Sequence, residues 1–404
     1  MSLIDSRRLG VPICGTPFLR RSGAILRAST VASEVSVDPL QTKLCDKFGI
    51  EYPIAAFTHC KDVAAAVTGA GGIGVLGMAG ASPDEIAAGV KWLRDRVGDK
   101  PFGIDVLIPA SVPPSVNRED LEAAIPEEHL AFVQKLKDQH EVPDPAEPIG
   151  VGGGGGMMSQ EGARRQLDAL VDLKVPIIAS GLGNPAFVLE AAHANGISVW
   201  GLVGKVRQAR REIESGVDVV IAQGHDAGGH NSPIGTFSLV PQVVRIAGET
   251  PILCAGGVTT GEQVVAALAL GAAGVWTGSI WLASHESDEH MMVKEKVLAA
   301  TEDDTILSRA LTGKRARLVK NAWTMAWEEP GAPKPLAMPL QGMLGGDLLR
   351  GAREAGIGEF AGTGLGQGVG VITEMKSCRQ IITELVFEAQ DVIEARFGEG
   401  NPLE

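Results

Sequence analysis

Eight short apolar runs alternate along the chain with longer segments in which apolar residues recur at helical spacing. The runs are nearly continuous in aliphatic residues, which is typical of strands buried on both faces of a parallel sheet. They span residues 52–57, 73–77, 102–108, 176–180, 197–203, 217–223, 251–256 and 273–278. Helical spacing is found in residues 84–97, 161–173, 185–196, 204–216 and 260–271. Eight strands alternating with helices predict an α/β fold, a (β/α)8 TIM barrel, with a doubly wound open sheet as the alternative.

Two long regions interrupt this alternation, and we expect them to be inserted loop or lid segments. Residues 109–160 are rich in proline, include five successive glycines and carry one short helical segment at 127–139. Residues 285–370 contain a proline-rich stretch and then the glycine-rich stretch GTGLGQGVG at 362–370. An amphipathic helix is predicted over 378–397. Long irregular segments in compact proteins often form lids or binding loops.

These patterns divide the chain into three expected parts. Residues 1–42 form an N-terminal extension, and residues 43–284 form the barrel with its loop insertion at 109–160. Residues 285–404 supply a lid-like segment and a C-terminal helix that completes the barrel domain.

The N-terminal extension differs in composition from the rest of the chain. Its first 37 residues are rich in arginine and serine and contain only two acidic residues, Asp5 and Glu34. Such a composition resembles an organelle transit peptide, but Asp5 near the start weakens that interpretation, so a disordered extension is favoured. We therefore expect a cytoplasmic protein, with organelle targeting by residues 1–40 as the second interpretation.

Composition and charge exclude several classes of protein. The formal net charge of −13 repels phosphodiester backbones and anionic membrane surfaces, so neither nucleic acid nor a membrane is an expected partner. No apolar run approaches the roughly 18 residues of a membrane-spanning helix. The five cysteines are widely spaced and form no CxxC pair, which favours reduced thiols over a disulfide framework. The chain has 52 glycines in 404 residues, against a usual share of ~7%. The sequence leaves a homo-oligomer open.

Glycine-rich turns after the seventh and eighth predicted strands indicate a phosphate site. The first turn contains Gly256 and Gly257, and the second contains Gly278 and Ser279. Loops after these two strands form the usual phosphate site of a TIM barrel, where backbone N–H groups and a helix N-terminus face the anion. Ordinary tight turns are the alternative. A separate GIGVLG match at 72–77 does not predict a dinucleotide fold, because its glycines lie within a strand and its flanks.

The stretch GHDAGGH (224–230) follows the sixth predicted strand and places ionisable groups at the expected mouth of the barrel. Gln223 can hydrogen-bond a planar ring, and Gly229 lets the backbone pass close to a flat ligand. His230 is placed for proton transfer near neutral pH, with a structural, helix-capping histidine as the alternative. Two histidines and one aspartate lack a further ligand at suitable spacing, so no metal site is predicted. A planar, phosphate-bearing cofactor such as FMN satisfies both the ring and the phosphate features.

Several segments together resemble the nitronate monooxygenase family, formerly the 2-nitropropane dioxygenases. They include AQGHDAGGH (222–230), the run 254–287, GKRARLVKN (313–321) and GQGVG (366–370), within a resemblance that covers about residues 43 to 390. The resemblance implies an FMN-dependent oxidoreductase that uses O2 to convert small alkyl nitronates or nitroalkanes to carbonyl compounds and nitrite.

The resemblance also implies roles for individual residues. Gly256, Gly257, Gly278 and Ser279 would hold the FMN phosphate. Gln223 and Gly229 would lie against the flavin, and His230 would be the catalytic base.

The chain departs from the family pattern at two places. AAFTHC (55–60) replaces the usual turn after the first strand, so that His59 is either a second acid/base group, a substrate contact or a core histidine. Asp105 replaces the usual asparagine beside the flavin, where a charged carboxylate would disfavour an anionic reduced ring unless it is protonated or paired. A flavin-dependent NAD(P)H enoyl-thioester or enone reductase is therefore the alternative function. A flavin-binding sensor and a flavin-free barrel for phosphorylated substrates also stay open.

Overall fold

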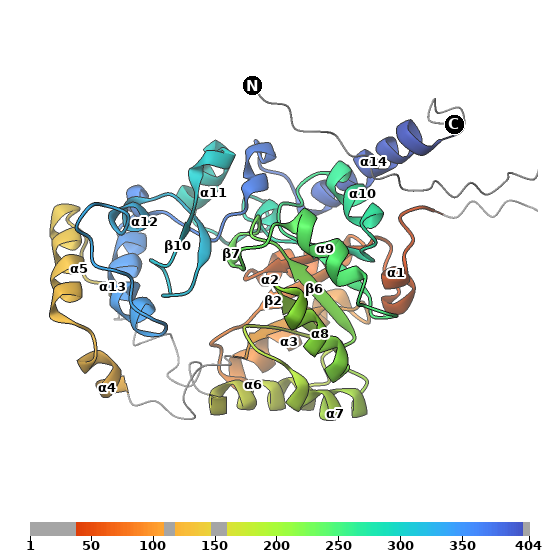
Figure 1. Cartoon of the computed structure of the whole chain (residues 1–404), viewed down its shortest axis with the longest axis horizontal. Coiled ribbons are helices and arrows are strands. Elements are labelled where there is room, and N and C mark those ends of the chain that lie inside the picture. The colour runs from red at the N-terminus through yellow and green to blue at the C-terminus, as the bar shows by residue number, and fades with distance from the viewer. Residues whose placement is uncertain (1–37, 109–117, 147–159, 399–404) are drawn as a thin grey trace, which may run out of the picture. The chain divides into compact units, whose positions relative to one another are not determined.

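The computed structural model describes residues 38–108, 118–146 and 160–398, and its centre is a closed parallel barrel (Figure 1). Each of the eight predicted strands is present, and β1 pairs with both β2 and β9 to close the ring. The TIM barrel prediction is therefore confirmed, and the open-sheet alternative was wrong. The strands are β1 (Ile54–Thr58), β2 (Ile73–Gly77), β3 (Gly103–Leu107), β4 (Ile177–Gly181), β5 (Ser198–Val203), β6 (Val219–Gln223), β8 (Ile252–Ala255) and β9 (Gly274–Thr277).

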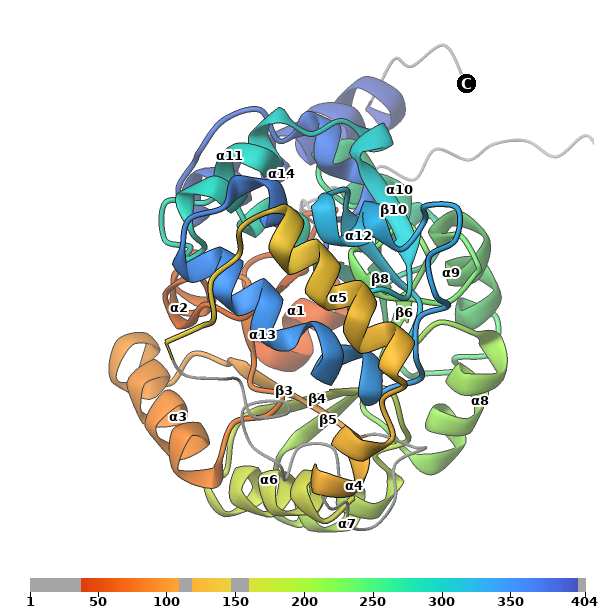
Figure 2. The same cartoon turned by 90° about the vertical axis from the view of Figure 1, so that its left-hand side faces the viewer.

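Helices surround the barrel in the alternating order that the apolar spacing predicts (Figure 2). The helix α14 (Cys378–Phe397) contacts both α10 and α2, and so takes the position of the eighth helix of the ring. The other outer helices are α2 (Lys61–Gly69), α3 (Pro83–Val97), α6 (Gln160–Asp172), α7 (Ala186–Ala194), α8 (Val206–Ser215), α9 (Thr236–Val244) and α10 (Gly261–Ala269).

The barrel interior is filled by apolar side chains and is closed at its N-terminal end by α1 (Lys43–Phe48). Leu44 of α1 belongs to the interior apolar cluster, and the Phe48 ring lies 5.3 Å from the Trp200 ring between centroids. The N-terminal end is therefore packed, which leaves the carboxyl ends of the strands for a functional site, as in TIM barrel enzymes.

The glycines of GIGVLG serve packing between a helix and the sheet. A Cβ on Gly74 would lie 2.0 Å from the Ala64 carbonyl oxygen, so α2 approaches β2 only because residue 74 has no side chain. This contact explains the motif without a nucleotide.

Two regions distant in sequence form a second body beside the barrel. The helices α4 (Arg118–Ala123) and α5 (Glu127–Gln139) come from the first insertion, and α12 (Ala322–Ala326) and α13 (Leu340–Glu354) come from the second. Figures 1 and 2 show α5 and α13 side by side, and their buried apolar residues form a cluster separate from the barrel core. The members of this lid cluster include Leu136, Trp323, Trp327, Leu344, Leu348 and Phe360.

A small antiparallel sheet lies at the barrel mouth, and the sequence pattern did not predict it. It has the order β10 (Thr305–Ser308), β11 (Ala316–Val319) and β7 (Gly229–His230). The helix α11 (Met291–Ala299) precedes it in the chain. The five-glycine run, the start of the first insertion and the first 37 residues lie outside the described residues. Within the described part of the chain, every helix is too short or too polar to cross a membrane.

Candidate active site

The loop after β6 is tied to the small sheet, and this connection positions His230. Gln223, the last residue of β6, donates its side-chain amide to the His230 carbonyl oxygen at 2.6 Å. His230 then pairs with Ala316 in the antiparallel register between β7 and β11. Gly224 begins the loop in a space where a Cβ would lie 2.1 Å from the Thr236 hydroxyl. The predicted residues Gln223, Gly229 and His230 are thus brought together.

His230 has the environment of a neutral imidazole. Its Nε2 lies 2.7 Å from Thr312 Oγ1, which also accepts a hydrogen bond from the Lys314 backbone N–H at 3.3 Å. Burial lowers the pKa of His230, and the neighbouring Lys314 ammonium group lowers it further. The imidazole is therefore available as a proton acceptor at neutral pH.

Sequence reasoning missed Thr312 and Lys314 as site residues. The signal was present in part, because GKRARLVKN (313–321) carried the family resemblance. No role followed from the motif alone, because its contact with His230 depends on the pairing of β7 with β11, which lie far apart in sequence.

The other ionisable groups of GHDAGGH hold the loop in place. Asp226 Oδ2 accepts the Thr236 backbone N–H at 2.7 Å at the start of α9. Burial favours the neutral form of Asp226, but the hydrogen bonds from Thr236 outweigh it and lower the pKa of the carboxyl. His225 Nδ1 lies 2.9 Å from Asp226 Oδ1. No set of three or more potential metal ligands comes together within the described residues.

The two glycine-rich turns form a cradle that fits a phosphate group. Gly256 and Gly257 have φ angles of 102° and 77°, in the left-handed region that favours glycine. A Cβ on Gly256 would lie 2.9 Å from the Ala227 backbone nitrogen. Among the described residues, none accepts a hydrogen bond from the backbone N–H of Gly256, Gly257 or Ser279. Free N–H groups in such a turn suit an anion.

The glycine-rich segment 362–370 passes directly over this cradle. The Gly366 backbone N–H donates to Ser279 Oγ at 2.9 Å, and the Gln367 N–H donates to the Asp226 carbonyl oxygen at 2.9 Å. The space beside Gly278 is open, since a Cβ there would have no described atom within 4 Å. The structure thus brings the residues predicted to hold a phosphate, Gly256, Gly257, Gly278 and Ser279, together beneath the glycine-rich segment 362–370.

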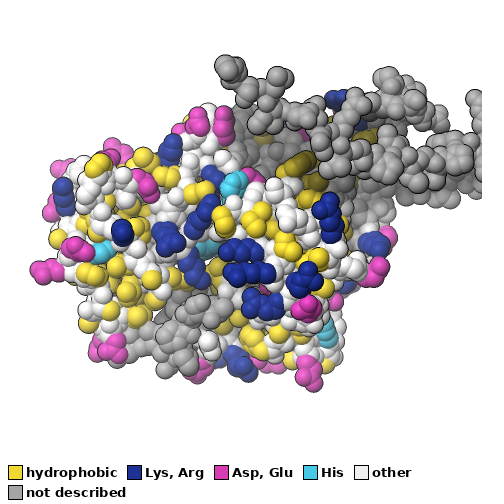
Figure 3. All heavy atoms as spheres, viewed as in Figure 1, with side chains coloured by type: hydrophobic (Ala, Val, Ile, Leu, Met, Phe, Trp, Pro, Cys, Tyr) yellow, Lys and Arg dark blue, Asp and Glu magenta, His cyan; other side chains and the backbone are white. Residues whose placement is uncertain are grey.

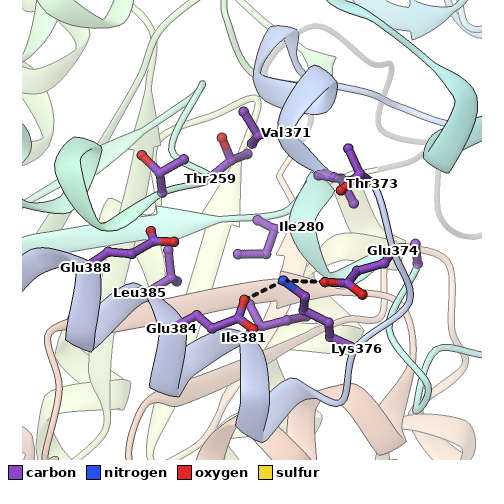
Figure 4. Close-up of a pocket in the computed structure, with 13 residues that line it drawn as sticks. Thr259, Ile280, Val371, Thr373, Glu374, Lys376, Ile381, Glu384, Leu385 and Glu388 are labelled. Atoms are coloured by element: carbon purple, nitrogen blue, oxygen red, sulfur yellow. Dashed lines mark hydrogen bonds and ion pairs between the residues drawn. The ribbon is translucent and has the colours of Figure 1, made fainter.

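A pocket of about 130 Å³ lies between the residues just before α10, the segment 371–376 and α14 (Figure 4). Lys376 Nζ is paired in it with Glu384 at 2.6 Å and with Glu374 at 3.1 Å. Glu388, which also lines it, accepts the Gly261 backbone N–H at 2.7 Å. None of the predicted catalytic or cofactor residues lines this pocket. Because carboxylates already neutralise its lysine, the pocket is unsuited to a phosphate.

Asp105 is a buried carboxyl group that faces the barrel interior. Its neighbours Ile104 and Val106 lie in the outer apolar cluster, so the alternation of the strand turns Asp105 inward. Its side chain has no hydrogen bond or ion pair with any described residue, and burial raises its pKa to about 8. The carboxyl group is therefore neutral at pH 7, which removes the conflict expected between a charged Asp105 and an anionic reduced flavin.

The altered turn after β1 places an aromatic pair at the same end of the barrel. His59 Nδ1 lies 3.1 Å from the Gly77 carbonyl oxygen, and Gly77 pairs with Asp105 in the sheet register. The Phe57 ring lies 5.1 Å from the His59 ring and is stacked on Trp276 at 5.8 Å. His59 is exposed, so it is not a core histidine.

Comparisons with known proteins agree with this site. The nitronate monooxygenase family model matches residues 39–388. The Mycobacterium tuberculosis protein Rv1533, whose name assigns it to the monooxygenases, is 40% identical over 88% of this chain and 98% of its own.

Two solved structures share the fold over most of the chain. The nitroalkane oxidase of Streptomyces ansochromogenes is 27% identical with a TM-score of 0.72, covering 87% of this chain and 99% of its own. FabK of Thermotoga maritima is 28% identical with a TM-score of 0.66, covering 88% of this chain and 97% of its own.

Fold, site and relatives together define a flavin-dependent oxidoreductase of the TIM barrel class. The family match extends over most of the sequence and includes the His230 loop and both glycine-rich turns. The chain belongs to the nitronate monooxygenase family.

Proposed function

We propose that this enzyme uses FMN and O2 to oxidise small alkyl nitronates or nitroalkanes to carbonyl compounds and nitrite. The observation that carries the proposal is the neutral, half-buried His230 held by Thr312 beside the Lys314 cation. A base and a cation side by side suit a substrate that loses a carbon-bound proton while its nitro group becomes anionic.

The cofactor proposal rests on the cradle. Gly256, Gly257, Gly278 and Ser279 would hold the phosphate of FMN, with Gln223, Gly229 and Asp105 toward the ring system. The described residues form one phosphate cradle and no dinucleotide-binding turn, which favours FMN over FAD. The bound flavin would accept the electrons of the substrate and pass them to O2.

Protein side chains would carry out the proton transfer and stabilise the charge that develops on the substrate. When His230 Nε2 carries its proton toward Thr312, Nδ1 keeps the lone pair that accepts the substrate proton. The Lys314 ammonium group would hold the nitro oxygens as they gain negative charge. A substrate supplied as a nitronate needs no deprotonation, and Lys314 alone would then orient it.

Oxygen uptake by the FMN-loaded protein with a small alkyl nitronate tests the proposal, with nitrite assayed in the same sample. We expect rapid uptake with release of nitrite. A yellow, folded protein that neither consumes oxygen nor releases nitrite would overturn it.

The alternative function is an NAD(P)H-dependent enoyl-thioester or enone reductase. The likeness to FabK and the helical second body, which could enclose a larger substrate, favour it. Anaerobic mixing with NADH or NADPH separates the two functions, because fast bleaching of the flavin supports the reductase.

A further inference from the structure

A cluster of basic residues lies beside His230, although the chain as a whole is acidic. Lys205 precedes α8, Arg207 and Arg210 lie on α8, and Arg315 precedes β11. We call these four residues the basic cluster. Figure 3 shows Lys and Arg side chains gathered across the middle of the face that carries α8, with acidic side chains mostly toward its edges.

Backbone contacts bring the two halves of the basic cluster together. Gly204, just before Lys205, packs against Ser232 so closely that a Cβ on it would lie 2.3 Å from Ser232 Cβ. The neighbouring Asn231 donates its backbone N–H to the Arg315 carbonyl oxygen at 3.3 Å. The residues 230–232 therefore link α8 to β11 next to the predicted base.

The charges of the basic cluster are not compensated within the described structure. None of its four side chains forms an ion pair with a described acidic residue. Arg207 and Arg210 are exposed one turn apart, and the first turn of α8 has no acidic residue. Cations at a helix N-terminus oppose the helix dipole, so this arrangement costs stability unless an anion binds there.

Unpaired polar atoms at the same place also indicate a ligand. Asn231 Oδ1, Ser232 Oγ and Arg315 Nε are buried and have no hydrogen-bond partner among the described residues. Buried polar atoms are usually paired in folded proteins, and two of these three, Arg315 Nε and Ser232 Oγ, are donors that suit an anion, whereas Asn231 Oδ1 is an acceptor and does not. A phosphate oxygen can accept from Arg315 Nε and Ser232 Oγ together.

We propose that the basic cluster, with Ser232, binds the diphosphate of a substrate or reductant whose reacting end reaches His230. This proposal rests on the proposed function only for the reaction that takes place at His230; the binding of the diphosphate does not depend on it. Small alkyl nitronates carry no phosphate, so they would react at His230 without occupying this site. Dinucleotides and coenzyme A thioesters share this chemistry. The cradle at Gly256 and Gly257 is a separate site, which the flavin phosphate fills.

Calorimetric titration of the flavin-loaded enzyme with sodium pyrophosphate at low ionic strength tests the site. We expect binding that Arg207→Glu and Arg210→Glu each weaken by about tenfold, because a favourable contact between charged groups becomes a repulsive one. Arg396→Glu, near the end of α14, makes the same change of charge and should bind as the wild type does.

The melting temperature shows whether weaker pyrophosphate binding by Arg207→Glu comes from misfolding. A glutamate in the first turn of α8 favours the helix dipole, so Arg207→Glu should melt no lower than the wild type. Titrations with NADPH and with acetyl-coenzyme A then show which kind of ligand carries the diphosphate. The compound that uses the basic cluster should bind more weakly to Arg207→Glu than to the wild type.

Absence of pyrophosphate binding, or equal affinity in the wild type and Arg207→Glu, would overturn this proposal. Nitrite release from a nitronate is measured separately and should not change in Arg207→Glu. Pyrophosphate binding without nitrite release would leave the diphosphate site standing and remove the proposed oxidation. Nitrite release without pyrophosphate binding would leave the proposed oxidation standing and remove the diphosphate site.

Discussion

At the scale of single residues, the surroundings of each group in the 224–230 loop determine what it can do. Asp226 and His230 are both partly buried and only four positions apart. Hydrogen bonds from Thr236 keep Asp226 charged and structural, whereas His230 contacts the Thr312 hydroxyl, feels the nearby Lys314 charge and stays neutral. The sequence contains both residues but not these partners, which come from other elements.

His230→Ala tests the base directly. We expect turnover of a neutral nitroalkane to fall by ~10²–10⁴-fold, the usual contribution of general acid–base catalysis, while flavin content stays constant. Steady-state oxygen uptake and the flavin absorbance measure the two quantities. His193→Ala, on the far helix α7, is the matched control, and unchanged kinetics in His230→Ala would remove the residue from its role.

Lys314→Met tests the electrostatic part of the same site. The Lys314 cation lowers the pKa of His230, so its removal should raise that pKa and move the acid limb of the kcat/KM profile to higher pH. The displacement should be modest, because burial is the larger cause of the lowered pKa. An acid limb that moves to lower pH, or not at all, would contradict the assignment.

Gly257→Val tests the phosphate cradle. Valine is strained at a φ of 77° and would place a branched side chain where N–H groups face the proposed phosphate. We expect FMN affinity to fall by at least about tenfold. Gly216→Val is the control for strain, since Gly216 has a φ of 95° at the end of α8 with open space around its Cβ position. Equal FMN retention by both variants would reject the cradle.

At the scale of elements, the sequence predicted those helices and strands that have a long or continuous apolar pattern. All eight barrel strands and the helices α5 and α14 were found, because each carries a buried run or a full helical period. The strands β7, β10 and β11 have two to four residues each and were missed, because they lack the longer apolar runs in which the equally short β8 and β9 lie. The same short sheet brings Thr312 and Lys314 to His230, so part of the site was missed with it.

Glu212 on α8 makes the attachment of that helix depend on pH. Its side chain is only 4% exposed, and its carboxyl group fills the space over Gly201, where a Cβ would lie 1.6 Å from Oε2. Burial raises the pKa of Glu212 from 4.5 to about 8, although Arg211 opposes the change. Between these two values the unfolded chain releases the proton and the folded chain keeps it. Stability should therefore fall as the pH rises, by up to ~1.4 kcal/mol per pH unit.

Glu212→Gln should flatten this dependence. Urea unfolding at pH 5 and at pH 8 gives the loss of stability between the two values, and we expect a smaller loss in Glu212→Gln than in the wild type. Some loss should persist, because Asp105 has a pKa raised over a similar range. Glu214→Gln, exposed on the same helix, is the control, and equal losses in the two variants would disprove the burial argument.

At the scale of the whole molecule, the lid cluster is an apolar core separate from the clusters inside and around the barrel. The sequence indicated two insertions but not that they pack on each other. The helices α5 and α13 are about 200 residues apart, and an apolar helix face alone does not show which other element it packs against. A separate core predicts separate stability, since contacts inside one cluster do not depend on those inside the other.

Leu348→Ala tests this independence. Leu348 is 2% exposed in the lid cluster, and removing such a side chain usually costs about 2–5 kcal/mol. We expect faster hydrogen exchange in α5 and α13, with the barrel strands and flavin content unchanged. Leu253→Ala, inside the barrel, should instead loosen the strands and release flavin. If Leu348→Ala also accelerated exchange throughout the barrel, the two cores would unfold as one unit.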